Sequence, residues 1–168
     1  IAATGERKSF AERHGMSIAS TVDAANGVAE RATAWLATPL LFAFRCYVAW
    51  QFLKSGWLKI SGWDSTLYLF QEEYHVPLLP PELAAVAGTA GELIFPALLV
   101  LGLVTRFAAL GLSAVNVLAV ISYAHVLLGE GFEAALGQHY LWGTLLFVVL
   151  VFGPGRWSLD AWLEGRRP

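Results

Sequence analysis

Residues 82–104 read ELAAVAGTAGELIFPALLVLGLV, and residues 107–128 read FAALGLSAVNVLAVISYAHVLL. A helix needs about 20 apolar residues to cross the roughly 30 Å hydrocarbon core of a bilayer, and both runs have that length. Only Thr105 and Arg106 separate them. The two runs therefore predict two consecutive transmembrane helices in an all-α integral membrane protein.

Two further apolar runs flank this pair. Residues 36–59 (LATPLLFAFRCYVAWQFLKSGWLK) precede it, and residues 139–153 (HYLWGTLLFVVLVFG) follow it. The last run reaches spanning length only when it is extended back to Ala134, and it ends at Gly-Pro-Gly because Pro154 cannot continue a helix. We predict a four-helix transmembrane bundle over residues 36–162, followed by a cytoplasmic tail over residues 163–168.

The segments outside the spans are more polar. Residues 63–81 (WDSTLYLFQEEYHVPLLPP) predict a short interfacial helix and then an extended stretch imposed by its prolines. Residues 1–35 form either an N-terminal leader or an amphipathic segment at the membrane interface, because residues 17–35 show modest helical periodicity. The chain begins with Ile1 and its only methionine is Met16, so either a segment precedes residue 1 or Met16 is the true start.

Composition supports a membrane protein and limits the chemistry. Hydrophobic residues make up 57% of the chain and charged residues 14%, against about 45–50% and 25% in soluble domains. A net charge of −2 gives no basis for a nucleic-acid partner. Cys46 is the only cysteine, which excludes an internal disulfide and any cysteine set for zinc, haem or iron–sulfur. No catalytic motif is present, so we assign no catalytic residue and no cofactor held by the chain itself.

The distribution of Lys and Arg predicts the orientation. Lys54 and Lys59 lie near the end of the first span, and the loop between the third and fourth spans has neither residue type. The opposite side carries Arg7, Lys8, Arg13, Arg31, Arg106, Arg156, Arg166 and Arg167. We therefore expect a multi-pass membrane protein with both termini in the cytoplasm, and the family resemblance described below implies the bacterial inner membrane.

Each span offers one polar residue at about the same depth, by a count of 1.5 Å per residue. These residues are Arg45, Glu92, Asn116 and Thr144. A charge at mid-bilayer costs at least about 2.5–3.5 kcal/mol, so each needs a partner or a purpose. One hypothesis is an Arg45–Glu92 ion pair that fixes helix register, with Asn116 and Thr144 completing its hydrogen bonds. The other is a binding or proton-handling site, and Lys59 lies on the same side of the first span.

A second polar set is predicted on the extracytoplasmic side. It comprises Glu72, Glu73, His75, His125, Glu130, Glu133 and His139. Histidines with carboxylates suit several metals, but no spacing here matches a known ligand motif. The prediction is that the chain has no metal site.

Two stretches carry a resemblance to a known family. They are R-x-Y-x-A-W-x-F-x-x-S-G-W-L-K in the first span and G-T-x-G-E-L-x-F-P-x-L-L-x-L-G-L-x-T-R-F-A-A-L across the second and third. They resemble the DoxX family of small bacterial membrane proteins over about residues 40–162. The matching positions include Arg45, Tyr47, Gly56, Lys59, Gly88, Glu92, Gly102, Thr105, Arg106 and Ala108. The linker and the ending GPGRWSLD resemble one subgroup, encoded beside copper-binding or metal-responsive peptides.

The resemblance implies a four-helix membrane bundle that acts as a subunit of a membrane-associated redox or metal-stress system, without a cofactor of its own. Its partners would be the lipid bilayer and other subunits of that system. An alternative is a quinone-linked subunit of the thiosulfate:quinone oxidoreductase type. Arg45, Glu92 and Lys59 would then handle the quinone head group and protons, with Trp57 and Trp63 as pocket walls. A third alternative is a small transporter that uses the polar layer as a substrate path.

Overall fold

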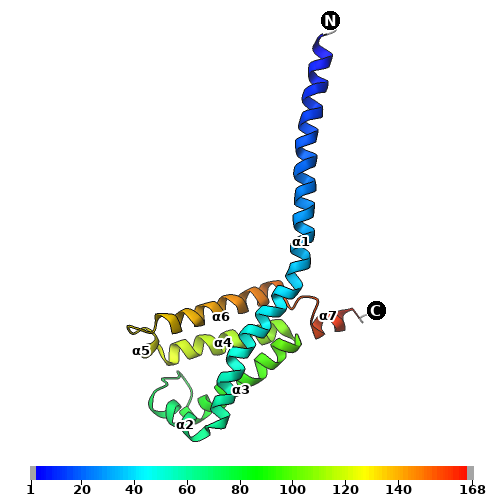
Figure 1. Cartoon of the computed structure of the whole chain (residues 1–168). Helices are drawn as coiled ribbons and strands as arrows, with labels where there is room; N and C mark the ends of the chain where they lie inside the picture. Colours follow the sequence, from blue (N-terminus) through cyan, green and yellow to red (C-terminus); the bar gives the residue numbers. More distant parts are fainter. Residues whose placement is uncertain (1–2, 166–168) are drawn as a thin grey trace. The chain divides into compact units, whose positions relative to one another are not determined.

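The computed structural model describes residues 3–165, with side chains described from residue 19 onward. Within these residues every regular element is a helix (Figure 1). The helices are α1 (Ala3–Ser61), α2 (Trp63–Glu72), α3 (Pro81–Leu101), α4 (Thr105–Ser122), α5 (Ala124–Leu127), α6 (Glu133–Phe152) and α7 (Leu159–Glu164). Of the predicted tail over residues 163–168, residues 166–168 lie outside the described part.

The chain divides into two compact units, residues 1–37 and residues 38–168. The first unit is helical from residue 3. Its residues from 19 onward are exposed, apart from the half-buried Gly27. That residues 1–35 form a leader or an interfacial segment stays a prediction, and residues 1–2 lie outside the described part.

The second unit contains the bundle, and four helices of the described chain are long and apolar enough to cross a membrane. They are α3, α4, α6 and the part of α1 from Ala19 to Ser61. Helix α4 packs against both α3 and α6, and α2 packs against α3 (Figure 1). The prediction of an all-α integral membrane four-helix bundle, with a short helix between the first two spans, is therefore confirmed.

The ends of the helices agree with the sequence where glycine or proline decides them. Helix α6 begins at Glu133, so the fourth span does need the residues before His139, and it ends at Phe152 before Gly153, whose φ is +82°. Helix α3 ends at Leu101 rather than at residue 104. Gly102 there has φ +67°, its N–H bonds to Leu99 O, and Leu103 N bonds to Leu98 O, which is the Schellman pattern of a glycine-terminated helix.

The predicted third span, residues 107–128, is too long at its C-terminal end. Helix α4 stops at Ser122 because Tyr123 leaves the helical region, with φ −117° and ψ 22°. The short α5 follows from Ala124. Periodicity did not show this break, because apolar residues such as Ile121 and Val126 continue on both sides of it.

The core is made of small and branched apolar side chains from all four spans. The buried members are Val48, Ala49, Phe52, Leu99, Ala108, Ala109, Leu112, Leu146 and Val149. Glycines bring the helices close together: a Cβ at Gly91 would lie 2.8 Å from Val115, and one at Gly111 would lie 2.5 Å from Phe95. In lipid, such close packing and interhelical hydrogen bonds drive helix association.

Candidate functional site

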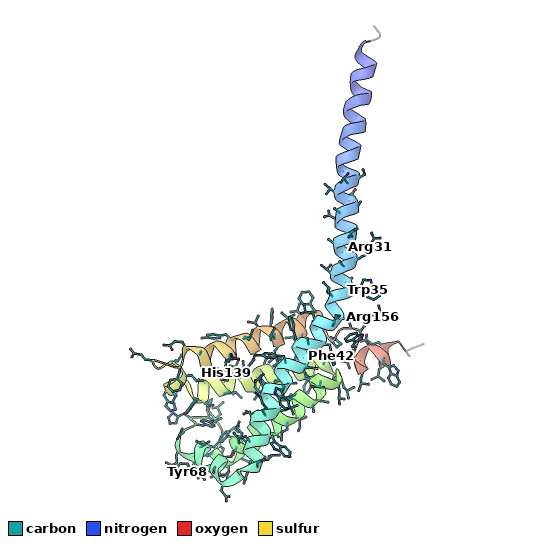
Figure 2. The ribbon with its side chains drawn as sticks, in the orientation of Figure 1. Arg31, Trp35, Phe42, Tyr68, His139 and Arg156 are labelled. Atoms are coloured by element: carbon teal, nitrogen blue, oxygen red, sulfur yellow. The ribbon has the colours of Figure 1, made fainter. Side chains whose placement is uncertain are left out.

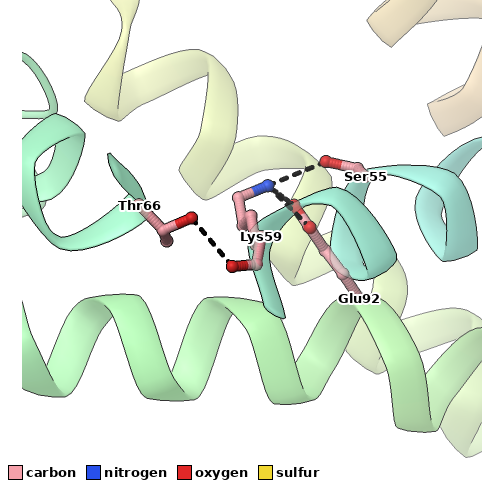
Figure 3. A network of polar contacts seen from close by, with 4 residues as sticks. All are labelled: Ser55, Lys59, Thr66 and Glu92. Carbon is pink, nitrogen blue, oxygen red and sulfur yellow. Dashed lines mark hydrogen bonds and ion pairs between the residues drawn. The ribbon is translucent and has the colours of Figure 1, made fainter. Parts of the chain in front are cut away.

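A buried ion pair joins α1 to α3. Lys59 Nζ lies 2.9 and 2.7 Å from the two carboxylate oxygens of Glu92, and it also donates to Ser55 Oγ at 2.7 Å (Figure 3). The side chains of Lys59 and Glu92 are only 17% and 10% exposed. Ser55 lies one helical turn before Lys59, so the same face of α1 supplies both contacts.

Backbone packing holds this pair in place. Gly56 lets α1 approach α3, because a Cβ there would lie 2.9 Å from Leu93 Cγ and 3.2 Å from Glu92 Cβ. The buried hydroxyl of Thr66, on α2, donates to the carbonyl oxygen of Lys59 at 3.0 Å (Figure 3). The pair therefore lies where α1, α2 and α3 meet.

The predicted Arg45–Glu92 pair is wrong. Arg45 is fully buried, but its guanidinium donates to the carbonyl oxygens of Leu99, at 3.2 Å, and of Trp157. The depth count assumed that the first span begins at residue 36. Arg45 instead lies level with Leu99, near the C-terminal end of α3 and roughly 10 Å along the helix from Glu92. The long side chain of Lys59, which lies 14 residues further along α1, reaches the Glu92 carboxylate instead.

Around Arg45 the C-terminal segment closes one end of the bundle. The Arg45 guanidinium lies over the Phe42 ring at 5.4 Å, and that ring meets the ring of Trp157 edge-on at 5.8 Å. Phe42 and Arg156, the neighbour of Trp157, lie at the same end of the bundle (Figure 2). Gly102 packs against Arg45 and Ser158, so closely that an added Cβ would lie 2.5 Å from Ser158 Cβ.

Asp160 ties this segment to the start of α4. Its carboxylate accepts from Val104 N and Thr105 N at 2.8 Å each, and from Thr105 Oγ1 at 2.7 Å. Its own N–H donates to Gly102 O at 2.8 Å. Burial alone would raise the pKa of Asp160, but the hydrogen bonds from Thr105 and Val104 and the charge of Arg45 hold that pKa below its usual range. Sequence analysis missed this cap, because Asp160 lies 55 residues after Thr105.

A second polar link joins α4 to α6. The buried Asn116 donates through Nδ2 to His139 O at 3.0 Å, and its Oδ1 lies 2.8 Å from His139 Nδ1. The His139 ring, marked in Figure 2, packs against Trp142 with ring centres 4.9 Å apart. His139 therefore belongs to the interior and not to the predicted extracytoplasmic set, because it lies one helical turn or more inside α6.

The other predicted site residues lie apart from these links. Thr144 is exposed and donates to Tyr140 O on its own helix at 2.9 Å, so it does not complete a layer with Arg45, Glu92 and Asn116. Trp57 is 67% exposed on the outer surface. Trp63 is half-buried and packs against the buried cluster of Phe70, Ala84 and Ala85, between α2 and α3. That these two tryptophans form quinone-pocket walls stays a prediction.

Four apolar helices, tied together by a buried ion pair, a buried arginine and an Asn–His link, define a polytopic helical membrane protein. The DoxX family model matches residues 40–125, and the chain belongs to the DoxX family. An uncharacterized protein of Haemophilus influenzae (strain Rd) is 28% identical over 131 residues, which is 74% of this chain and 83% of that protein. No solved structure matches the chain.

Proposed function

We propose that this DoxX-family protein is a non-catalytic membrane subunit that supports a membrane-associated redox or metal-stress system and carries no cofactor of its own. The observation behind the proposal is that several of its interior polar groups form contacts between helices. Lys59 and Glu92 join α1 to α3, and Asn116 joins α4 to His139 of α6. Arg45 joins α1 to α3 and to Trp157. Groups used in this way hold helices in register, as a scaffold requires.

The cellular location is part of the same proposal. The excess of Lys and Arg before the first span, between the second and third spans and after the fourth supports a plasma-membrane protein with both ends in the cytoplasm. The resemblance to a subgroup encoded beside metal-responsive peptides supports the link to metal stress.

Co-purification tests the subunit role. The protein, expressed at its natural level with a small tag, is extracted in a mild detergent and its partners are identified by mass spectrometry. We expect a redox or metal-handling protein in stoichiometric amount. The Arg45→Ala variant loses the contacts that hold the C-terminal segment. Less of that partner should co-purify with this variant than with the wild type. A purified chain that turns over a substrate with no partner present would contradict the proposal.

A quinone-linked oxidoreductase subunit is the second candidate, and one observation favours it. Lys59 and Glu92 are both ionisable and remain partly accessible. A quinone head group bound here would meet a hydrogen-bond donor, Lys59, and a carboxylate that can carry a proton, Glu92. The Glu92→Gln variant keeps the shape of the side chain and removes its charge. If this candidate is right, quinone reduction in membranes should fall at least tenfold at an unchanged protein level.

Glu82→Gln is the matched control for that experiment. Glu82 is an exposed carboxylate on the same helix, and it accepts a hydrogen bond from Gln71 at 2.8 Å. Equal quinone reduction in all three proteins would remove this candidate. The transporter alternative lacks a comparable observation, because Thr144 faces outward and Arg45 lies away from Glu92.

A further inference from the structure

Two connections meet at the end of the bundle away from Arg45. One is the loop between α2 and α3, and the other is the turn between α4 and α5. His75 N donates to Ser122 O at 2.9 Å, and Tyr123 Oη donates to Glu73 Oε2 at 3.2 Å. The rings of Tyr74 and Tyr123 meet edge-on at 5.1 Å. These contacts fix the two connections relative to each other.

They also bring two imidazoles close together. The rings of His75 and His125 have centres 4.8 Å apart and planes inclined at 39°, and both residues are exposed. A metal ion about 2.0–2.1 Å from one nitrogen of each of two imidazoles leaves the ring centres roughly 5 Å apart. The observed separation therefore fits two histidines that share one metal ion.

The charge around this pair attracts cations. No Lys or Arg occurs in residues 60–105 or in residues 107–155. The connections at this end and the helix ends beside them carry Glu72, Glu73, Glu82, Glu130 and Glu133. A surface with one sign of charge raises the local concentration of counter-ions. A metal cation that approaches the two imidazoles thus meets acidic groups and no competing ammonium or guanidinium from these stretches.

We propose that His75 and His125 form a two-histidine site for a divalent transition-metal ion. Imidazole suits copper, nickel and zinc, and Cu²⁺ binds most tightly among the divalent metals of the first row. In the described residues no group of three His, Cys, Asp or Glu side chains forms a cluster, so water completes the coordination and Glu73 lies outside it. The site revises the sequence-based prediction of no metal, and it does not depend on the proposed subunit role.

A bound ion would link the α2–α3 loop to the α4–α5 turn. A ligand that binds the folded protein alone raises the free energy of unfolding by RT ln(1 + [L]/Kd), which grows with the logarithm of the ligand concentration. Metal binding at this site should therefore raise the melting temperature, and the rise should require both histidines.

The test uses the full chain in phosphatidylcholine nanodiscs, purified with a tag that contains no histidine. It is titrated with CuCl₂ by calorimetry and by electron paramagnetic resonance. We expect one Cu²⁺ per chain, two nitrogen ligands in the spectrum and a higher melting temperature. His75→Ala and His125→Ala should each weaken binding at least tenfold. Leu78→Ala, a fully exposed substitution in the same loop as His75, should bind as the wild type does.

Three results would overturn the site. One is a spectrum with oxygen ligands only, and another is equal Cu²⁺ affinity in the wild type and both alanine variants. The third is displacement of Cu²⁺ by excess MgCl₂, since Mg²⁺ competes for carboxylates and not for imidazoles. His14 and His139 are present in every variant, so the comparison is specific to the pair. If an alanine variant does not fold, His75→Asn and His125→Asn replace it. The wild-type spectrum still tests the site, because a spectrum with oxygen ligands only would overturn it.

Discussion

At the scale of single residues, Gly102 combines two demands that no other amino acid meets. Its φ of +67° is left-handed, and Arg45 and Ser158 fill the space where a side chain would be. Either demand alone favours glycine. Together they explain why a glycine stands where the second span ends and the C-terminal segment packs.

Gly102→Ala should therefore lower the stability of the bundle severely. A left-handed alanine costs roughly 1–2 kcal/mol and overpacking about 1–3 kcal/mol, so we expect a loss of roughly 2–5 kcal/mol in the unfolding free energy. Thermal unfolding in nanodiscs measures it.

Gly131→Ala separates the two contributions. Gly131 also has a left-handed φ, +87°, but nothing lies within 4 Å of an added Cβ. This control should lose only the backbone part of the stability. Equal losses in the two variants would mean that contact with Arg45 and Ser158 contributes nothing.

The sequence predicted which polar residues are buried better than it predicted their partners. Arg45, Glu92 and Asn116 were expected inside the bundle, and they are 0%, 8% and 4% exposed. Their partners depend on how far each helix is shifted along its neighbours. Sequence alone cannot supply that shift, so Lys59 replaced Arg45 as the partner of Glu92. Gly56 was the available signal, because a small residue one turn from Lys59 allows α1 to approach α3 closely.

At the scale of elements, α4 depends on a distant residue for its start. Val104 and Thr105 point their backbone N–H groups at the Asp160 carboxylate, which acts as a cap supplied by α7. A capping side chain replaced by alanine costs about 0.5–2 kcal/mol. Sequence rules look for a capping residue directly before the helix. The residue there is Val104, whose side chain has no hydrogen-bond acceptor.

Asp160→Ala should lower the melting temperature at neutral pH and lose that effect in acid. The folded-state pKa of Asp160 lies below its usual value, near 3.9 when unfolded. Its stabilisation is therefore complete above that value and is lost as the pH falls through the folded-state pKa.

Melting curves of the wild type and of Asp160→Ala between pH 7 and pH 3 give the measurement. The gap between the two melting temperatures should shrink as the pH drops below about 4. Asp160→Asn, which keeps an acceptor oxygen but not the charge, should fall between them at pH 7. A gap that is constant across the range would show that the charge of Asp160 plays no part.

At the scale of the whole molecule, four spans place the start of the first span and the end of the fourth span on the same side of the membrane. The apolar runs and glycine-rich ends made this number of spans predictable. The packing order, with α4 between α3 and α6, was not predictable, because every span has a similar composition.

Reporter fusions after Glu164 test the orientation. Green fluorescent protein fused there should fluoresce, and alkaline phosphatase at the same position should be inactive, because we expect a cytoplasmic end. Fusions after Glu130 should give the opposite pair of results. Active phosphatase after Glu164 would reverse the orientation and place His75 and His125 in the cytoplasm.

The cap on α4 also has a consequence for biosynthesis. Ribosomes add about 5–20 residues per second, so roughly 3–11 s pass between the synthesis of Thr105 and that of Asp160. Throughout this interval the first turn of α4 has no cap, and Arg45 lacks the carbonyl of Trp157. A nascent chain that stops before Trp157 keeps these defects permanently. The contacts of Trp157 and Asp160 therefore stabilise α1 and the start of α4 only after all four spans have been synthesised.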